Sequence, residues 1–211
     1  KEGYPDEKIF ITGNTVIDAL QYAIKEDYKF ELPLLNELDY ENKKIILLTS
    51  HRRENIGKPM ENIFSAIKDI VNKYDDVEVV FPIHLNPKVR EIAYNVFEDN
   101  PKVHIIEPLD YEPFTNLMAK SYMVVTDSGG LQEEAPSLGK PVLVIREETE
   151  RPEGIKAGTA KLVGTHYDNI FREADILISN SQEYKKMANA VNPYGDGKAA
   201  ERIVDVIVEN L

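Results

Sequence analysis

The segment from Thr49 to Asn55 brings a histidine and two arginines together directly after an apolar run, Ile45 to Leu48. An arginine side chain carries a permanent charge on a planar fork that fits the oxygens of a phosphate. Residues at the end of a buried strand in an α/β sheet lie where ligands bind. The segment therefore favours a phosphate-binding role, and the alternative is a solvated loop held by arginine–glutamate pairs.

A second polar segment, Thr126 to Glu134, follows another apolar run and contains Gly129 and Gly130. Glycines let a backbone approach a ligand closely, and the N–H groups at a helix start attract anions. Ser128 can donate to a phosphate or cap the helix, and Glu134 can accept hydrogen bonds from two sugar hydroxyls. A tight turn with an N-cap is the structural alternative.

Two further segments offer a charge and aromatic rings. Arg151 lies in a highly charged loop and is a candidate for a second phosphate contact, although such loops are more often surface ion-pair clusters. Tyr111 and Phe114 follow another predicted strand, where an aromatic ring could stack on a base. Their alternative role is packing at the start of the next helix.

Short apolar runs alternate with amphipathic stretches, and this order must position the polar segments. Near-continuous apolar strands indicate burial on both faces, and alternating strands and helices indicate a parallel sheet with right-handed crossovers. We therefore predict an α/β fold with a doubly wound parallel sheet. The predicted strands are Ile45–Leu48, Val77–Ile83, Val103–Ile106, Tyr122–Thr126, Val142–Ile145 and Lys161–Val163.

Some local features refine this prediction. Met60 to Tyr74 has the apolar spacing of a helix, and Asn86 with Pro87 predicts the start of another helix. Residues Lys8 to Thr12 resemble a further strand. Ala199 to Leu211 predicts a terminal helix with an apolar stripe, which we expect to fold back on its own domain or to pair with a second copy.

Composition excludes several functions. The chain has 211 residues, 42% of them hydrophobic, and a formal net charge of −12. An acidic chain of this kind disfavours binding to nucleic acid. It has no cysteine, no apolar stretch long enough to span a bilayer and no signal-peptide core, so the cytoplasm is the default location and no membrane is expected as a partner.

Familiar catalytic motifs are also missing from the sequence. No strand is followed by the glycine pattern of dinucleotide-binding sites, and neither a P-loop nor a nucleophile elbow is present. The four histidines are scattered without metal-ligand spacing. The sequence therefore predicts neither a metal nor a redox cofactor.

Longer motifs resemble the C-terminal domain of the non-hydrolysing UDP-N-acetylglucosamine 2-epimerases. The most specific is the run from Asp127 to Pro141, and the resemblance extends along the whole chain. The other matching segments are Ile11–Asp18, Thr49–Asn55, His84–Pro87, Glu150–Glu153 and Asn192–Gly197. That family has the GT-B arrangement, in which two Rossmann-like domains face each other across a cleft.

The resemblance implies roles for single residues. Ser128, Gly129 and Gly130 are expected to hold the diphosphate of UDP, and Glu134 the ribose hydroxyls. Phe114 is expected to lie by the uracil and Arg151 to contact a phosphate. His51 is expected to be catalytic, beside the leaving diphosphate. Arg52 and His84 are expected to bind a second, regulatory UDP-N-acetylglucosamine.

The resemblance also implies a reaction. Family members invert C2 of UDP-N-acetylglucosamine to give UDP-N-acetylmannosamine, by elimination and re-addition of UDP and without a redox cofactor, and so supply nucleotide sugar for cell-surface polysaccharides. The base at C2 is expected in an N-terminal domain that this chain lacks. Because the chain opens at Lys1 without an initiator methionine, we expect a fragment of a longer protein. We expect this fragment to be inactive alone, since it lacks the base. The resemblance implies a homodimer at full length.

The expected organisation has three parts. Residues 1–40 form an interdomain connection and linker helix, residues 41–197 the Rossmann-like UDP-binding domain, and residues 198–211 a helix that crosses to the N-terminal domain. Two alternative functions share this nucleotide site: the binding half of a GT-B glycosyltransferase, and a non-catalytic UDP-sugar sensor.

Overall fold

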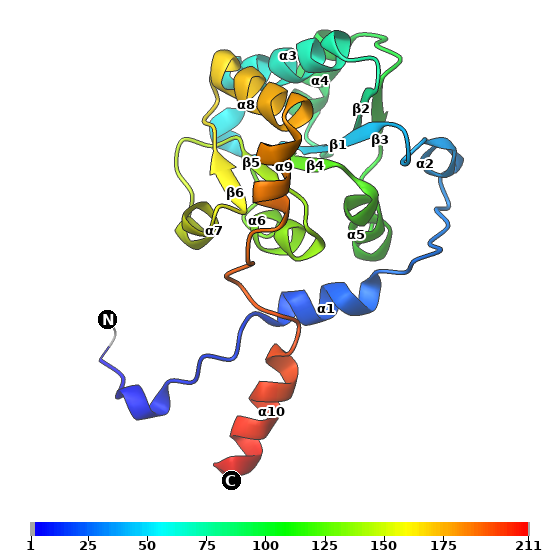
Figure 1. The fold of residues 1–211 in the computed structure, drawn as a ribbon. Coiled ribbons are helices and arrows are strands. Elements are labelled where there is room, and N and C mark those ends of the chain that lie inside the picture. The colour runs from blue at the N-terminus through cyan, green and yellow to red at the C-terminus, as the bar shows by residue number, and fades with distance from the viewer. Residues whose placement is uncertain (1–2, 211) are drawn as a thin grey trace.

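A parallel sheet of six strands, in the order β3-β2-β1-β4-β5-β6, lies at the centre of the computed structural model, which describes residues 3–210 (Figure 1). Every neighbouring pair of strands is parallel. The strands are β1 (Lys44–Thr49), β2 (Val77–Pro82), β3 (Val103–Ile106), β4 (Met123–Thr126), β5 (Val142–Val144) and β6 (Ala160–Leu162). The strand order reverses direction at the junction of β1 and β4.

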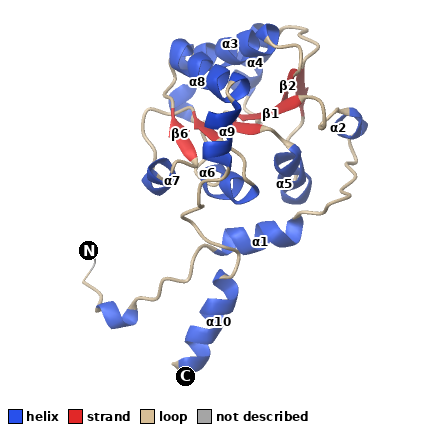
Figure 2. Cartoon of the chain, viewed as in Figure 1, coloured by secondary structure: helices blue, strands red, loops and turns tan. Residues whose placement is uncertain are grey.

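Helices cover both faces of this sheet (Figure 2). One face carries α3 (Lys58–Lys73), α4 (Pro87–Phe97) and α8 (Tyr167–Ser179), and the other carries α1 (Thr15–Ala23), α2 (Pro33–Glu37), α5 (Tyr111–Lys120) and α6 (Leu131–Glu134). The remaining helices are η1 (Asp6–Lys8), η2 (Arg53–Asn55), η3 (Ala135–Leu138), α7 (Pro152–Ala157), α9 (Ser181–Ala188) and α10 (Ala199–Glu209). Within residues 3–210, none of the helices has the length and apolar character needed to cross a bilayer.

Alternate side chains of β1, β2, β4 and β5 enter two separate apolar cores. Ile46 and Leu48 of β1 pack with α3, α4 and α8, whereas Ile45 and Leu47 pack with helices on the opposite face. This division explains the continuous apolar runs, because a strand covered on both faces has no solvent side that requires polar residues. The predicted doubly wound α/β fold is confirmed.

The predicted helix starts are also confirmed. Met60, Ile63 and Phe64 are fully buried on α3, as their spacing predicts. The side chain of Asn86 accepts a hydrogen bond from the N–H of Lys88 at 3.1 Å, and so caps α4. Both helices are amphipathic because only one side of each meets the sheet.

The predicted strand at Lys8 to Thr12 is wrong. Asp6 to Lys8 form a 3₁₀ turn, and the next residues have no regular structure. Ile11 is 96% exposed, and these residues pair with no strand within residues 3–210. An apolar, β-branched segment becomes a strand only where another strand supplies hydrogen bonds and a surface to pack on.

The two ends of the described chain are joined at α1 and α10. The carboxylate of Asp18, on α1, accepts hydrogen bonds from the N–H groups of Ala199 and Ala200 at 3.1 and 2.9 Å. The N–H of Asn14 donates to the carbonyl of Tyr194 at 2.9 Å. An acidic side chain at a helix start satisfies N–H groups that lack partners within the helix. Asp18 therefore caps α10 from another helix.

Beyond this junction α10 extends away from the sheet, as Figure 1 shows. Val204, Ile207 and Val208 on its apolar stripe are 57%, 52% and 67% exposed. The expectation that this helix folds back on its own domain is therefore wrong, while pairing with a second copy stays a prediction. The predicted stripe residue Leu211 lies outside the described residues.

Replacing Asp18 with alanine should loosen the first turns of α10, because two N–H groups lose their acceptor. Loss of a cap costs about 1 kcal/mol, which corresponds to roughly fivefold faster hydrogen exchange along the helix. Amide exchange measured by NMR over Ala199 to Ile207 tests this. Asp205→Ala, at an exposed position of the same helix, is the matched control, and equal exchange in both variants would contradict the capping role.

Candidate functional site

The reversal of strand order between β1 and β4 opens a crevice at the carboxyl edge of the sheet. Thr49 and Thr126 lie side by side at the ends of these strands, with their hydroxyl oxygens 2.6 Å apart. The chain leaves the two strands toward helices on opposite faces, so the loops that follow them diverge. Ligands of doubly wound sheets bind at this position.

A buried carboxylate holds these two loops together. Asp127 is fully buried, and its Oδ2 accepts hydrogen bonds from the backbone N–H groups of His51 and Arg52, each at 2.9 Å. The Ser50 hydroxyl and the Asn55 amide donate to the same oxygen at 3.2 and 3.1 Å. The loop after β1 is therefore folded around one side chain from the loop after β4.

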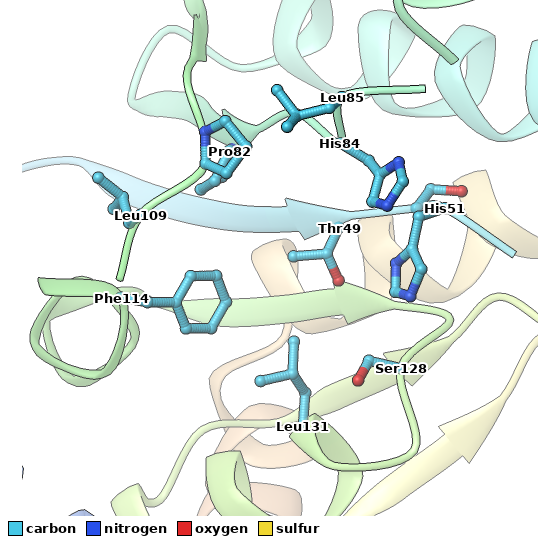
Figure 3. A pocket seen from close by; sticks show the side chains of 11 residues that line it. Thr49, His51, Pro82, His84, Leu85, Leu109, Phe114, Ser128 and Leu131 are labelled. Atoms are coloured by element: carbon cyan, nitrogen blue, oxygen red, sulfur yellow. The ribbon is translucent and has the colours of Figure 1, made fainter. Parts of the chain in front are cut away.

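A pocket of about 540 Å³ opens beside this junction (Figure 3). It brings together residues that follow β1, β2, β3 and β4, although these segments are far apart in sequence. Most of its walls are apolar, and polar groups are concentrated at one end, where His51 and Ser128 lie. The lining residues are Thr49, Ser50, His51, Pro82, His84, Leu85, Pro108, Leu109, Phe114, Ser128 and Leu131.

The rings of His51 and His84 stack at the polar end, with centroids 5.4 Å apart and planes inclined by 14°. The Nδ1 atom of His51 lies 3.3 Å from Oδ1 of Asp127. The N–H of Asn86 donates to Nδ1 of His84 at 3.1 Å, so this nitrogen serves as a hydrogen-bond acceptor. Two predicted site residues thus become direct neighbours.

The Ser128–Gly130 loop is shaped for close approach. The N–H of Ser128 donates to the hydroxyl of Thr126 at 2.9 Å, while no oxygen of residues 3–210 accepts from the N–H of Gly129 or Gly130. A Cβ atom at Gly129 would meet nothing within 4 Å. The open side of this loop can therefore receive an anion. Ser128 lines the pocket and does not cap α6, since the cap position is Gly130.

Glu134 is buried one turn beyond Leu131, a residue that lines the pocket. Burial, together with the neighbouring charge of Glu133, raises the pKa of Glu134 to about 7. No group in the part of the chain that the structure describes donates to its carboxylate, and Glu134 itself is not among the residues that line the pocket. An acceptor that the protein leaves unpaired suits a ligand that brings hydroxyl groups.

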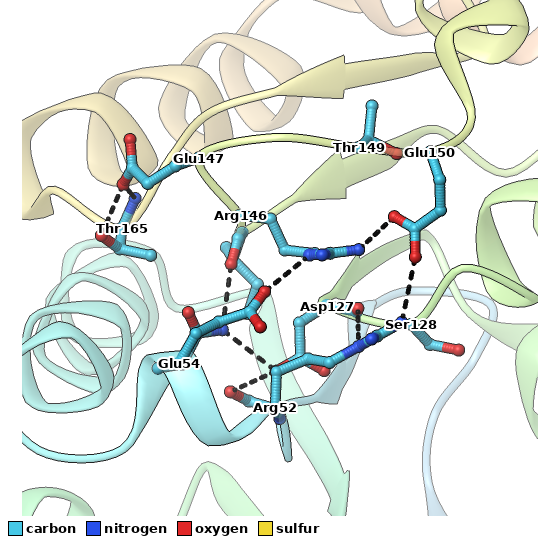
Figure 4. A network of polar contacts seen from close by, with 12 residues as sticks. Arg52, Glu54, Asp127, Ser128, Arg146, Glu147, Thr149, Glu150 and Thr165 are labelled. Atoms are coloured by element: carbon cyan, nitrogen blue, oxygen red, sulfur yellow. Dashed lines mark hydrogen bonds and ion pairs between the residues drawn. The ribbon is translucent and has the colours of Figure 1, made fainter.

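The arginines are engaged with glutamates, as Figure 4 shows for the loops after β1 and β5. Arg52 donates to the carbonyl of Asp127 at 3.3 Å and to Glu150 at 3.4 Å. Arg146 donates to Glu54 at 3.0 Å and also pairs with Glu150. The loops after β1 and β5 therefore form arginine–glutamate pairs, which was the alternative to a phosphate-binding role.

Arg151 lies outside the pocket lining, and its guanidinium pairs with Glu133. The predicted contact of Arg151 with a phosphate stays a prediction, since such a contact requires this pair to rearrange. Arg52 follows His51 on the same loop and lines a second hollow of about 530 Å³. The other residues that line it are His51, Arg53, Glu54, His84 and Asn86. Within residues 3–210, no group of three or more acidic or histidine side chains is arranged to hold a metal ion.

Sequence reasoning missed Asp127 and Glu133 as organising residues. Glu133 pairs with Arg151 and accepts from the amide of Asn14, and its carbonyl accepts from Asn192 at 3.1 Å. An acidic residue directly after a buried strand is a signal that could have identified Asp127, because a carboxylate there must find donors nearby. Glu133 has no comparable signal, since its partners are distant in sequence.

Comparison with known proteins gives a consistent result. The family described as UDP-N-acetylglucosamine 2-epimerase matches residues 1–208. The UDP-N-acetylglucosamine 2-epimerase of Bacillus subtilis is 54% identical over 208 residues, which are 99% of this chain and 54% of that protein. The chain therefore spans about half the length of the curated relatives it matches.

Solved structures agree with the sequence comparison. The structure of S. aureus MnaA with UDP superimposes with a TM-score of 0.91 and 50% identity, covering 98% of this chain and 55% of that one. The UDP-GlcNAc 2-epimerase from Neisseria meningitidis bound to UDP-GlcNAc gives a TM-score of 0.88 and 45% identity, covering 99% and 57%.

The raised pKa of Glu134 predicts that uridine binds more tightly at high pH. The pKa of about 7 means that the carboxyl is largely protonated below this pH and ionised above it, and the ionised form is the better acceptor for ribose hydroxyls. Between about pH 6 and pH 8 we expect uridine affinity to rise by up to about tenfold. NMR titration measures this change.

Two controls isolate the carboxyl group. Glu134→Gln removes the titration and should give affinity that is constant over this pH range. 2′,3′-Dideoxyuridine lacks the hydroxyls and should bind wild type independently of pH. If uridine affinity is constant in wild type as well, Glu134 does not contact the ribose.

Proposed function

Because the chain belongs to the UDP-N-acetylglucosamine 2-epimerase family, we propose that it is the UDP-binding half of such an enzyme. The observation that carries the proposal is the crevice between β1 and β4. An apolar pocket lies there, lined by Ser128 and Leu131, and the same segment of the chain contains the open glycine loop and the buried Glu134. These features complement, respectively, the base, the diphosphate and the ribose of UDP.

In this proposal each part of UDP meets a different segment of the chain. Ser128, Gly129 and Gly130 hold the diphosphate with hydroxyl and N–H donors. Glu134 accepts from the ribose hydroxyls, and Phe114 packs beside the uracil within the apolar part of the pocket. The names of two solved relatives include UDP or UDP-GlcNAc as the bound molecule, which supports this assignment.

The proposed reaction interconverts UDP-N-acetylglucosamine and UDP-N-acetylmannosamine by elimination and re-addition of UDP, without a metal or redox cofactor. Elimination requires stabilisation of the departing diphosphate and a base at C2. His51 and the Ser128–Gly130 loop serve the first requirement. The base is assigned to an N-terminal domain of the GT-B arrangement, as is consistent with a chain about half as long as its relatives.

The exposed helix α10 is the proposed connection to that domain. Its apolar residues Val204, Ile207 and Val208 lack a partner within residues 3–210, and the exposed Phe10 and Ile11 lie on the other connection. Residues 1–40 and 198–211 would thus join the UDP-binding domain, residues 41–197, to the rest of the enzyme. The proposal includes a homodimer at full length, a cytoplasmic location and a role in supplying sugars for surface polysaccharides.

A second UDP-N-acetylglucosamine is proposed to bind near Arg52 and His84 for regulation. The hollow beside His51 is lined by both residues and has a volume of about 530 Å³, which supports this proposal. The glycosyltransferase alternative has lost its support, because the family match covers almost the whole chain. A non-catalytic sensor remains the competing function, and activity of the complete protein distinguishes it from an epimerase.

We expect the chain to bind UDP in the presence of a chelator, because N–H and hydroxyl donors can replace a metal at the diphosphate. Glu134→Ala should weaken UDP binding by about 1.5–3 kcal/mol, as a charge-assisted hydrogen bond is lost, and leave pyrophosphate binding unchanged. Calorimetry with both ligands tests the site. Equal losses would refute the ribose assignment, and no UDP binding at millimolar concentration would refute the nucleotide site.

The chain alone should show no measurable conversion of UDP-N-acetylglucosamine, since it lacks a base at C2. A chimera with the remaining part of the Bacillus subtilis relative should be active, as an assay of C2 epimerisation would detect. In that chimera, His51→Ala should lower kcat by about 100-fold or more. Robust activity of the isolated chain would overturn the assignment of the base, and an inactive chimera that binds UDP would favour the sensor.

A further inference from the structure

The two oxygens of the Asp127 carboxylate have different environments. Oδ2 accepts four hydrogen bonds, from the N–H groups of His51 and Arg52 and from the side chains of Ser50 and Asn55. Oδ1 is the one fully buried side-chain nitrogen or oxygen in residues 3–210 that has no hydrogen-bond partner. A buried carboxylate oxygen without a donor is uncommon, so a donor is expected beside it.

The nearest candidate donor is the His51 ring, whose Nδ1 lies 3.3 Å from this oxygen. The separation suits a hydrogen bond in length but not in direction, and a modest rotation of the imidazole would align it. The backbone of His51 is already fixed by Oδ2, so the ring can turn without moving the loop. One carboxylate can therefore hold both the backbone and the side chain of the same residue.

We infer that Asp127 is a positioning residue for His51 and holds its ring in the tautomer that carries the proton on Nδ1. Nε2, on the far side of the ring, then presents a lone pair toward the pocket that His51 lines. Free imidazole side chains do not require this tautomer, so it is a specific consequence of the Asp127 contact.

A diphosphate that occupies the crevice would meet Nε2 of His51, and this step rests on the proposed function. A lone pair on Nε2 repels a phosphate oxygen, whereas a protonated Nε2 donates to it. Binding of UDP should therefore draw one proton from solvent onto Nε2, which makes His51 an imidazolium. The buried charge of Asp127 balances the new positive charge.

The surroundings of His51 are compatible with this protonation. The groups that face the ring are Asp127 from the loop after β4, His84 from the loop after β2, and Arg52, Arg53 and Glu54 on its own loop. Nδ1 of the stacked His84 accepts a hydrogen bond from Asn86. Arg52 is paired with Glu150. A positive charge on His51 is therefore balanced by the buried carboxylate of Asp127, and Arg53 on the same loop is the neighbouring positive charge that opposes it.

The tautomer can be observed directly by long-range ¹H–¹⁵N NMR of the histidine rings in the 211-residue chain, at about pH 8, where free imidazole is neutral. Wild type should show His51 with the proton on Nδ1. In Asp127→Asn the amide oxygen takes the place of Oδ2 and accepts from the same four donors. The NH₂ group takes the place of Oδ1 and faces Nδ1 of His51. His51 should consequently change to the tautomer with the proton on Nε2.

Ser50→Ala is the matched control, because it removes a hydrogen bond to Oδ2 but leaves the contact of Oδ1 with His51. This variant should keep the wild-type tautomer. A wild-type spectrum with the proton on Nε2 would overturn the inference, and it decides the question even if Asp127→Asn fails to fold. The same tautomer in wild type and a folded Asp127→Asn would overturn it equally.

A second NMR experiment adds UDP or uridine to wild type and to Asp127→Asn. In wild type, UDP should protonate Nε2 of His51, and uridine, which has no phosphate, should not. In Asp127→Asn, where Nε2 already carries a proton, UDP should bind without proton uptake at His51. UDP binding that shifts pocket resonances without protonating Nε2 would refute the proton uptake and leave the proposed function intact. If UDP shifts no pocket resonance, the proposed function fails, and the tautomer comparison still decides the role of Asp127.

Discussion

The carboxylate of Asp127 joins the two loops between which the candidate site opens. A doubly wound sheet sends the chain to opposite faces after β1 and β4. The backbone N–H groups of the loops that follow therefore need acceptors outside the sheet. Asp127 takes up two of them and ties the loop after β1 to the loop after β4. The positions of His51, Ser128 and the pocket between them depend on this one buried side chain.

The proposed function requires this acidic protein to bind an anion in the same region. The net charge of −12 opposes anion binding at long range, and Arg52, Arg146 and Arg151 are each paired with a glutamate. The N–H groups of Gly129 and Gly130, in contrast, are uncharged donors from which no oxygen of residues 3–210 accepts. Such donors act only at hydrogen-bond distance, so the proposed binding of a diphosphate at this loop depends on its shape more than on long-range electrostatic attraction.

Neighbouring glutamates on α6 have separate tasks that couple the site to the ends of the chain. Glu134 is buried three residues beyond Leu131 of the pocket lining, whereas Glu133 contacts Asn14, Arg151 and, through its carbonyl, Asn192. Asn14 begins α1, and Asp18 of the same helix caps α10. The segments leading into and out of the domain are thus packed together on the helix that follows the glycine loop.

The sequence by itself determined the layered architecture and the location of the site. Continuous apolar strands separated by amphipathic helices permit few folds other than a doubly wound sheet, and the polar residues at strand ends then identify the crevice. Only the tertiary structure decided that Asp127 organises His51, that Arg151 pairs with Glu133, and that Lys8 to Thr12 form no strand. The physical reason is that a local pattern records whether a residue is buried or extended. Its partners, which lie 76 residues away for Asp127 and His51, are chosen by the packing of the whole domain.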